Sequence, residues 1–98
     1  MPRFLIERMI PGLGDLTREQ LMDVSQKSNR VLAELGPQIQ WVHSYVTQDK
    51  MTCVYLAPNA DMVRQHAGRG GFPADRVDEV LFIVDPLTAD GALWTTKP

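Results

Sequence analysis

The sequence predicts an α+β domain with the element order β-α-β-β-α-β, in which a four-stranded antiparallel sheet carries both helices on one face. Three observations lead to this prediction. Apolar residues recur at helical spacing between Thr17 and Gly36, two segments rich in Val, Tyr and Thr flank a polar turn at residues 48–50, and an apolar run occupies residues 80–84. At 98 residues and 44% hydrophobic, the chain is the size of one small domain.

Turn and capping residues bound the first two elements. Residues 3–8 are compatible with a β-strand and are followed by Pro-Gly at residues 11–12, which predicts a first strand. Thr17 then has the position of a helix N-cap, with Gln20 at the spacing of a capping box. The helical pattern of apolar residues continues until Gly36, where we expect the helix to end.

The middle of the chain predicts a β-hairpin. Its strands are residues 39–47 and 51–57, and the intervening residues 48–50 form the turn. A three-residue turn fixes which residues of the two strands face each other. The expected pairs are Thr47 with Met51, Tyr45 with Cys53, and His43 with Tyr55.

A second, shorter helix and a last strand complete the pattern. Asn59 is a candidate N-cap, and the helical spacing continues to about Ala67 before several glycines interrupt it. Residues 76–84 predict the last strand. We therefore expect a ferredoxin-like domain over residues 1–86 and a C-terminal extension over residues 87–98, which has no regular period.

Alternation of side chains along the strands assigns residues to the two faces of this sheet. The face expected beneath the helices carries Phe4, Ile6, Val42, Ser44, Val46, Val54 and Leu56. The opposite face is expected to carry Leu5, Glu7, Trp41, His43, Tyr45, Cys53 and Tyr55. Because an aromatic face of this kind is unlikely to stay in contact with water, we expect two copies to pack as a dimeric α/β barrel around a pocket lined by Trp41, Tyr45 and Tyr55.

Charge and cysteine content exclude several classes of function. Ten Lys and Arg against twelve Asp and Glu give a net charge of −2 without a basic cluster, so we expect no nucleic-acid partner. The longest apolar run is far shorter than a membrane span, and we expect no membrane insertion. Since the N-terminus does not resemble a secretory signal and Cys53 is the single cysteine, we expect a cytoplasmic protein.

Three stretches of the sequence resemble a known family: "MPRFLIER", "QKSNRVLAELGPQIQWVHSYVTQDKMTCVYLAP" and "GFPADRVDEV". They are similar to short bacterial proteins formerly described as a domain of unknown function, one member of which is a nickel-binding, nickel-responsive dimer with a ferredoxin-like fold. The resemblance covers residues 1–86, and residues 67–71 carry an extra glycine relative to the family's pattern. It implies a homodimer and Ni²⁺ bound at the surface.

Four residues are candidate metal ligands. His43 and His66 offer imidazoles, which suit nickel, although each can also be a structural histidine: His43 bonded to Tyr55 or Glu7 in a dimer interior, and His66 shielding the edge of the core.

Glu7 and Cys53 are the other two candidates. Glu7 can ligate a metal, act as a base beside His43, or simply pair with Arg3 or Arg8. Cys53 is either a soft ligand or an inert packed side chain.

Two functions remain open on the sequence alone. The first is a small metal-binding protein that binds, buffers or responds to Ni²⁺. The second is a cofactor-independent enzyme, of the monooxygenase, isomerase or cyclase type, that acts on a small organic molecule in a cleft on the aromatic face, where Tyr45 and Tyr55 could donate to a substrate carbonyl. No catalytic triad or phosphate-binding loop distinguishes them.

Overall fold

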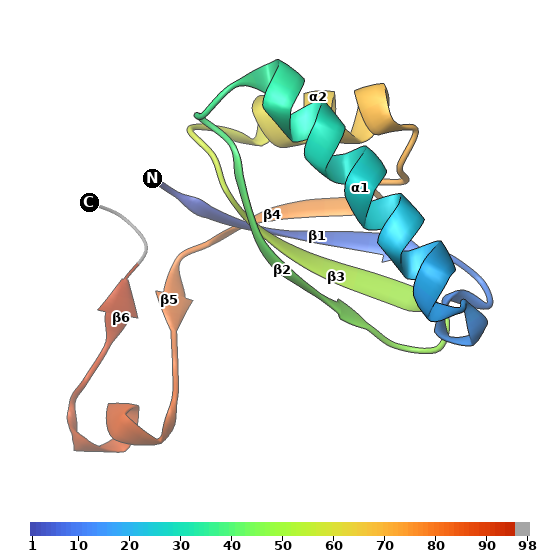
Figure 1. Ribbon diagram of the computed structural model, residues 1–98. Coiled ribbons are helices and arrows are strands. Elements are labelled where there is room, and N and C mark those ends of the chain that lie inside the picture. The colour runs from blue at the N-terminus through green and yellow to red at the C-terminus, as the bar shows by residue number, and fades with distance from the viewer. Residues whose placement is uncertain (96–98) are drawn as a thin grey trace.

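The structure is a computed structural model that describes residues 1–95, and it has the expected ferredoxin-like α+β fold (Figure 1). Both helices cover one face of an antiparallel sheet with the strand order β2-β3-β1-β4. The elements of this body are β1 (Arg3–Met9), α1 (Arg18–Leu35), β2 (Gln40–Val46), β3 (Lys50–Leu56), α2 (Ala60–Gly70) and β4 (Arg76–Val80). Within residues 1–95, no helix is both long and apolar enough to cross a membrane.

The predicted helix caps are present. Thr17 Oγ1 accepts from the backbone N–H of Gln20 at 3.1 Å, and the Gln20 side chain accepts from the Thr17 N–H at 2.9 Å, which completes a capping box. Asn59 Oδ1 accepts from the Met62 N–H at the start of α2. This helix runs past Ala67 to Gly70, because the left-handed residue that ends it is Gly71, with φ of 68°.

The last predicted strand is wrong in its second half. β4 ends at Val80, which pairs with Arg3, the first residue of β1, so there is no neighbouring strand beyond that point. The chain instead leaves the sheet and forms a projecting hairpin, here called the C-terminal arm (residues 81–95) (Figure 1). In the arm, β5 (Phe82–Ile83) pairs with β6 (Trp94–Thr95) across a 3₁₀ turn at Pro86–Asp90. Another 3₁₀ turn, at Leu13–Asp15, joins β1 to α1.

The hairpin register differs from the expected one by one residue. Val46 pairs with Met51, Tyr45 with Thr52, and His43 with Val54. The turn is shorter than expected because the Thr47 N–H donates to the Lys50 carbonyl at 2.9 Å, which leaves two residues between them. The loop that follows β1 fixes this turn, since the N–H groups of Ile10, Gly12 and Gly14 all donate to Gln48 or Asp49.

The shift reverses the side of the sheet on which several residues lie. Cys53 pairs with Ile6 and Tyr55 with Phe4, so Cys53 and Tyr55 face the helices, and each is only 2% exposed. The predicted placement of these two residues opposite the helices is therefore wrong. Val54 and Leu56, expected under the helices, face the other side.

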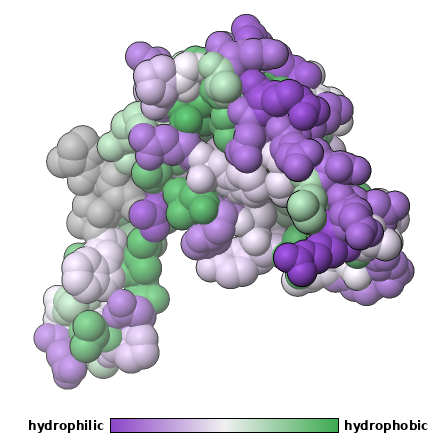
Figure 2. Space-filling model, in the orientation of Figure 1, coloured by the Kyte–Doolittle hydropathy of each residue, from purple (hydrophilic) through white to green (hydrophobic). Residues whose placement is uncertain are grey.

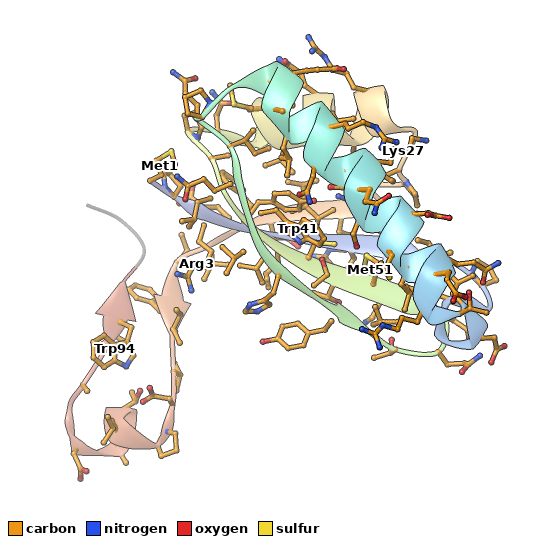
Figure 3. The ribbon with its side chains drawn as sticks, in the orientation of Figure 1. Met1, Arg3, Lys27, Trp41, Met51 and Trp94 are labelled. Atoms are coloured by element: carbon orange, nitrogen blue, oxygen red, sulfur yellow. The ribbon has the colours of Figure 1, made fainter. Side chains whose placement is uncertain are left out.

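A β-bulge in β2 changes the placement of one more aromatic residue. The pairing shifts between Trp41, which lies opposite Tyr55, and His43, which lies opposite Val54. Trp41 therefore faces the helices, contrary to the prediction, whereas His43 and Tyr45 point away from them as predicted. Figure 3 shows Trp41 and Met51 between α1 and the sheet.

The helix-free side of the sheet is here called the open face (Leu5, Glu7, His43, Tyr45, Thr52, Val54). In Figure 1 both helices lie on the other side of the sheet, and the C-terminal arm projects from one end of it. The open face is less aromatic than expected, because Tyr45 and His43 are its ring-bearing members among these six residues. Tyr45 is 60% exposed and Leu5 is 38% exposed.

The interior lies between the helices and the sheet, where His66 joins the two helices. Phe4, Ile6, Tyr55 and Val63 are fully or almost fully buried there. His66 on α2 has no exposed surface, and its Nε2 lies 3.1 Å from Ser28 Oγ on α1. Burial lowers the pKa of His66 below its usual range, and the charge of Arg8 lowers it further.

A packing constraint ends α2. A Cβ added at Gly70 would lie 2.2 Å from Cε2 of Phe72, so only glycine leaves room for that ring. Gly68, two residues earlier and on the exposed side of the same helix, has nothing within 4 Å of the corresponding position. Packing therefore requires a glycine at position 70, whereas position 68 has room for a larger residue.

We expect Gly70→Ala to destabilise the protein by about 1–3 kcal/mol, because the added methyl group displaces the packed Phe72 ring. Gly68→Ala is the matched control, and it should stabilise the protein by up to about 1 kcal/mol through helix propensity. Urea unfolding of both variants measures these free energies. Equal effects at the two positions would contradict the packing described here.

The lowered pKa of His66 predicts a pH dependence of stability. The unfolded chain, with a histidine pKa near 6.5, takes up a proton before the folded protein does. The free energy of unfolding should therefore be highest above about pH 6.5 and fall as the pH drops below that value toward the folded-state pKa. Thermal unfolding between pH 7.5 and 5 should show this loss in His43→Gln, the control, and a smaller loss in His66→Gln.

Candidate functional site

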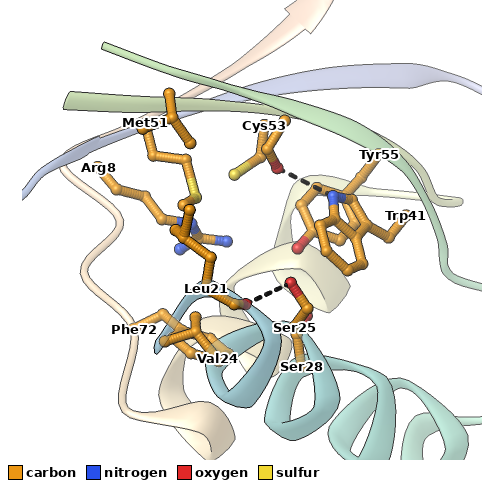
Figure 4. A pocket seen from close by; sticks show the side chains of 12 residues that line it. Arg8, Leu21, Val24, Ser25, Ser28, Trp41, Met51, Cys53, Tyr55 and Phe72 are labelled. Carbon is orange, nitrogen blue, oxygen red and sulfur yellow. Dashed lines mark hydrogen bonds between the residues drawn. The ribbon is translucent and has the colours of Figure 1, made fainter. Parts of the chain in front are cut away.

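A cleft with about 190 Å³ of free space lies between α1 and the helix-covered side of the sheet (Figure 4). Strands β1, β2 and β3 form its floor, α1 forms one wall, and Phe72 comes from the segment after α2. The lining residues are Arg8, Leu21, Val24, Ser25, Ser28, Trp41, Ser44, Val46, Met51, Cys53, Tyr55 and Phe72.

Arg8 is the charged residue of this lining. Phe4, Ile6 and Arg8 are every second residue of β1 and therefore share one face of the strand. The Arg8 side chain thus points toward the helices, and it is only 3% exposed. Its guanidinium carbon lies 5.6 Å from the centre of the Phe72 ring, and Nη1 donates to the Pro73 carbonyl. Nη2 is buried without a hydrogen-bond partner. No Asp or Glu among residues 1–95 forms an ion pair with Arg8.

The polar groups beside Arg8 are neutral. Burial raises the pKa of the Tyr55 hydroxyl above its usual range, although the nearby charge of Arg8 opposes this shift. Behind the cleft, the His66 ring lies 5.2 Å from the ring of Tyr55, and its lowered pKa keeps it uncharged at neutral pH. Arg8 is therefore a single positive charge among hydroxyl groups and apolar side chains.

The outer part of the cleft is mostly apolar. The hydroxyl of Ser25 donates to the Leu21 carbonyl at 2.8 Å, and Trp41 Nε1 donates to Ser44 Oγ at 2.9 Å, so these polar groups bond to each other (Figure 4). Leu21, Val24 and Met51 supply the remaining surface. Such a combination, apolar walls around a few convergent polar groups, is typical of small-molecule sites.

The candidate metal ligands lie on different sides of the sheet. His43 is on the open face, where its Nε2 lies 3.0 Å from the Tyr45 hydroxyl, and not beside Tyr55 or Glu7 as the sequence suggested. His66 and Cys53 are buried on the helix side. His66 is therefore a core residue, not one at the core's edge.

Glu7 lies on the open face and pairs with lysine and arginine. Its carboxylate is 3.1 Å from Lys50 Nζ and 3.9 Å from Arg76 Nε, whereas the sequence suggested Arg3 or Arg8 as the partner. Within residues 1–95, no three His, Cys, Asp or Glu side chains come together as a set that could hold a metal ion. A single copy of the described chain thus does not fit a complete nickel site.

Of the three residues expected to line a pocket, Trp41 and Tyr55 line the cleft, but from the helix side of the sheet. Tyr45 is not part of it. The cleft is therefore on the opposite side of the sheet from the pocket that the enzyme hypothesis required. Arg8 was not among the predicted site residues, although its spacing from Phe4 and Ile6 indicates that it shares their buried face.

Comparison with known proteins identifies relatives of the chain. Residues 4–80 match the family model described as "Nickel responsive protein SCO4226-like". The crystal structure of SCO4226 from Streptomyces coelicolor A3(2) superposes with a TM-score of 0.67 at 21% sequence identity, covering 80% of this chain and 94% of that chain. No curated protein matches the sequence. Because the family model matches most of its length, the chain belongs to the SCO4226-like family of nickel responsive proteins.

Proposed function

We propose that the protein is a nickel-responsive homodimer that binds Ni²⁺ at its surface, and that it acts by binding, not by catalysis. The family match over residues 4–80 is the observation that carries this proposal. We also expect the protein to be cytoplasmic, which remains a prediction from the sequence.

His43 is the imidazole best placed to bind the metal. It lies on an exposed edge strand, whereas His66 has no exposed surface and already bonds to Ser28. Nickel accepts imidazole and carboxylate ligands. Glu7 shares the open face with His43 but stands two strands away, roughly 9–10 Å across the sheet. A second copy facing the first would bring further ligands to His43.

Exposed apolar residues support the homodimer. The open face presents Leu5 and Tyr45 to solvent, and the C-terminal arm presents a second group of apolar side chains. Figure 2 shows hydrophobic residues along this arm, in contrast to the hydrophilic outer surface around α1. The exposed apolar members of the arm are Leu81, Phe82, Val84, Leu87, Leu93 and Trp94. A second copy of the same chain, related to the first by a two-fold axis, would cover both the open face and the arm.

We expect the protein to sediment as a dimer, with twice the 11.0 kDa mass of one chain, at micromolar concentration. Leu5→Lys should shift it to monomers, because the substitution places a charge in the centre of the open face. Met22→Lys alters an exposed apolar residue on α1, away from the open face, and should leave the dimer intact. A monomeric parent protein, or a dimer unaffected by Leu5→Lys, contradicts pairing through the open face.

Calorimetry with Ni²⁺ tests the metal proposal. Replacing His43 by Ala should weaken nickel binding by at least about tenfold, since it removes the exposed imidazole. His66→Gln serves as the control and should retain the affinity if circular dichroism shows it to be folded, because nickel does not reach the buried ring. Unchanged affinity in His43→Ala, or an equal loss in both variants, would show that His43 is not the ligand.

A further inference from the structure

The Arg8 side chain carries a buried charge without a counter-ion. Arginine keeps its charge in proteins, and removing such a charge from water is unfavourable unless an anion or a full set of hydrogen bonds offsets it. Here the Phe72 ring, the Pro73 carbonyl and the Tyr55 hydroxyl contact only part of the guanidinium, and Nη2 has no hydrogen-bond partner. A negatively charged group beside Nη2 would supply the missing interaction.

We propose that the cleft binds a small carboxylic acid, with its carboxylate on Arg8 and its apolar body between α1 and β2–β3. Arg8 lines the cleft and forms the charged end of this site. The uncharged Tyr55 hydroxyl lines the same floor, next to Ser28 and Arg8. This site is separate from the nickel proposal, because His43 and Glu7 lie on the other side of the sheet.

A carboxylate fits better than a phosphate. One guanidinium neutralises one negative charge, and no other cationic side chain lines the cleft. A phosphate group, which carries up to two charges, would leave the second one buried among apolar side chains at a cost in desolvation. The floor therefore favours a singly charged anion.

The ligand's body must be compact and apolar. The free space, about 190 Å³, is below the roughly 300–1,000 Å³ typical of sites for drug-sized ligands. Leu21, Val24 and Met51 form apolar walls, and the Trp41 indole offers an aromatic surface. A single aromatic ring or a short branched chain matches these dimensions and this chemistry.

Benzoate is a suitable probe, and thermal shift and calorimetry on the full chain measure its binding. We expect benzoate to raise the unfolding temperature and to bind at least tenfold more tightly than benzyl alcohol, which keeps the ring without the charge. Acetate, which keeps the charge without the ring, and inorganic phosphate should also bind at least tenfold more weakly.

Two variants remove the site in different ways. Arg8→Met keeps an unbranched apolar stem and removes the charged guanidinium, so benzoate binding should fall at least tenfold. Arg76→Met is the matched control, because Arg76 is an exposed arginine of β4 that pairs with Asp78 outside the cleft. Val46→Trp, at the rim of the cleft, should block benzoate while leaving Arg8 in place, and it provides the test if Arg8→Met does not fold.

Three results would overturn the proposal: no benzoate binding to the parent protein, tighter binding of phosphate than of benzoate, or full benzoate binding by every folded variant among Arg8→Met and Val46→Trp. His43→Ala should keep its benzoate affinity. The nickel proposal can therefore fail while the acid site stands, and the reverse also holds.

Discussion

The pairing of β1 with β3 determines what the helices cover. Because Phe4 lies opposite Tyr55, Ile6 opposite Cys53 and Arg8 opposite Met51, these side chains share the side of the sheet that packs against α1 and α2. The first two pairs build the core. The third brings a permanent cation under α1, where Phe72 and Pro73 contact it and no acidic residue among residues 1–95 pairs with it.

The two sides of the sheet therefore have different chemistry. On the open face, His43 and Glu7 are accessible and lie near other polar groups, and it is here that we propose that a second copy completes a nickel site. On the helix side, a single charge lies at the floor of an apolar cleft, which suits one small anion. Because Arg8 is costly to bury alone, occupancy of the cleft should also set part of the protein's stability.

The sequence predicted the element order and both helix caps, because the signals for these features are local: Thr17 with Gln20, and Asn59 before α2. It did not predict which residues share the cleft. The one-residue shift at Gln48 and Asp49 depends on hydrogen bonds from the loop after β1, and the bulge after Trp41 leaves no local signal. Since a shift of one residue exchanges the faces of a strand, Cys53 and Tyr55 were assigned to the wrong side.

Nuclear magnetic resonance of the arginine side chains can show whether the Arg8 guanidinium is the anion-binding group of the cleft, as we propose. During a benzoate titration, the Nε–H resonance of Arg8 should shift and saturate together with the calorimetric binding curve, while that of the exposed Arg76 stays in place. An Arg8 resonance that does not move while benzoate binds, or one that moves only as much as that of Arg76, would show that benzoate does not bind at Arg8.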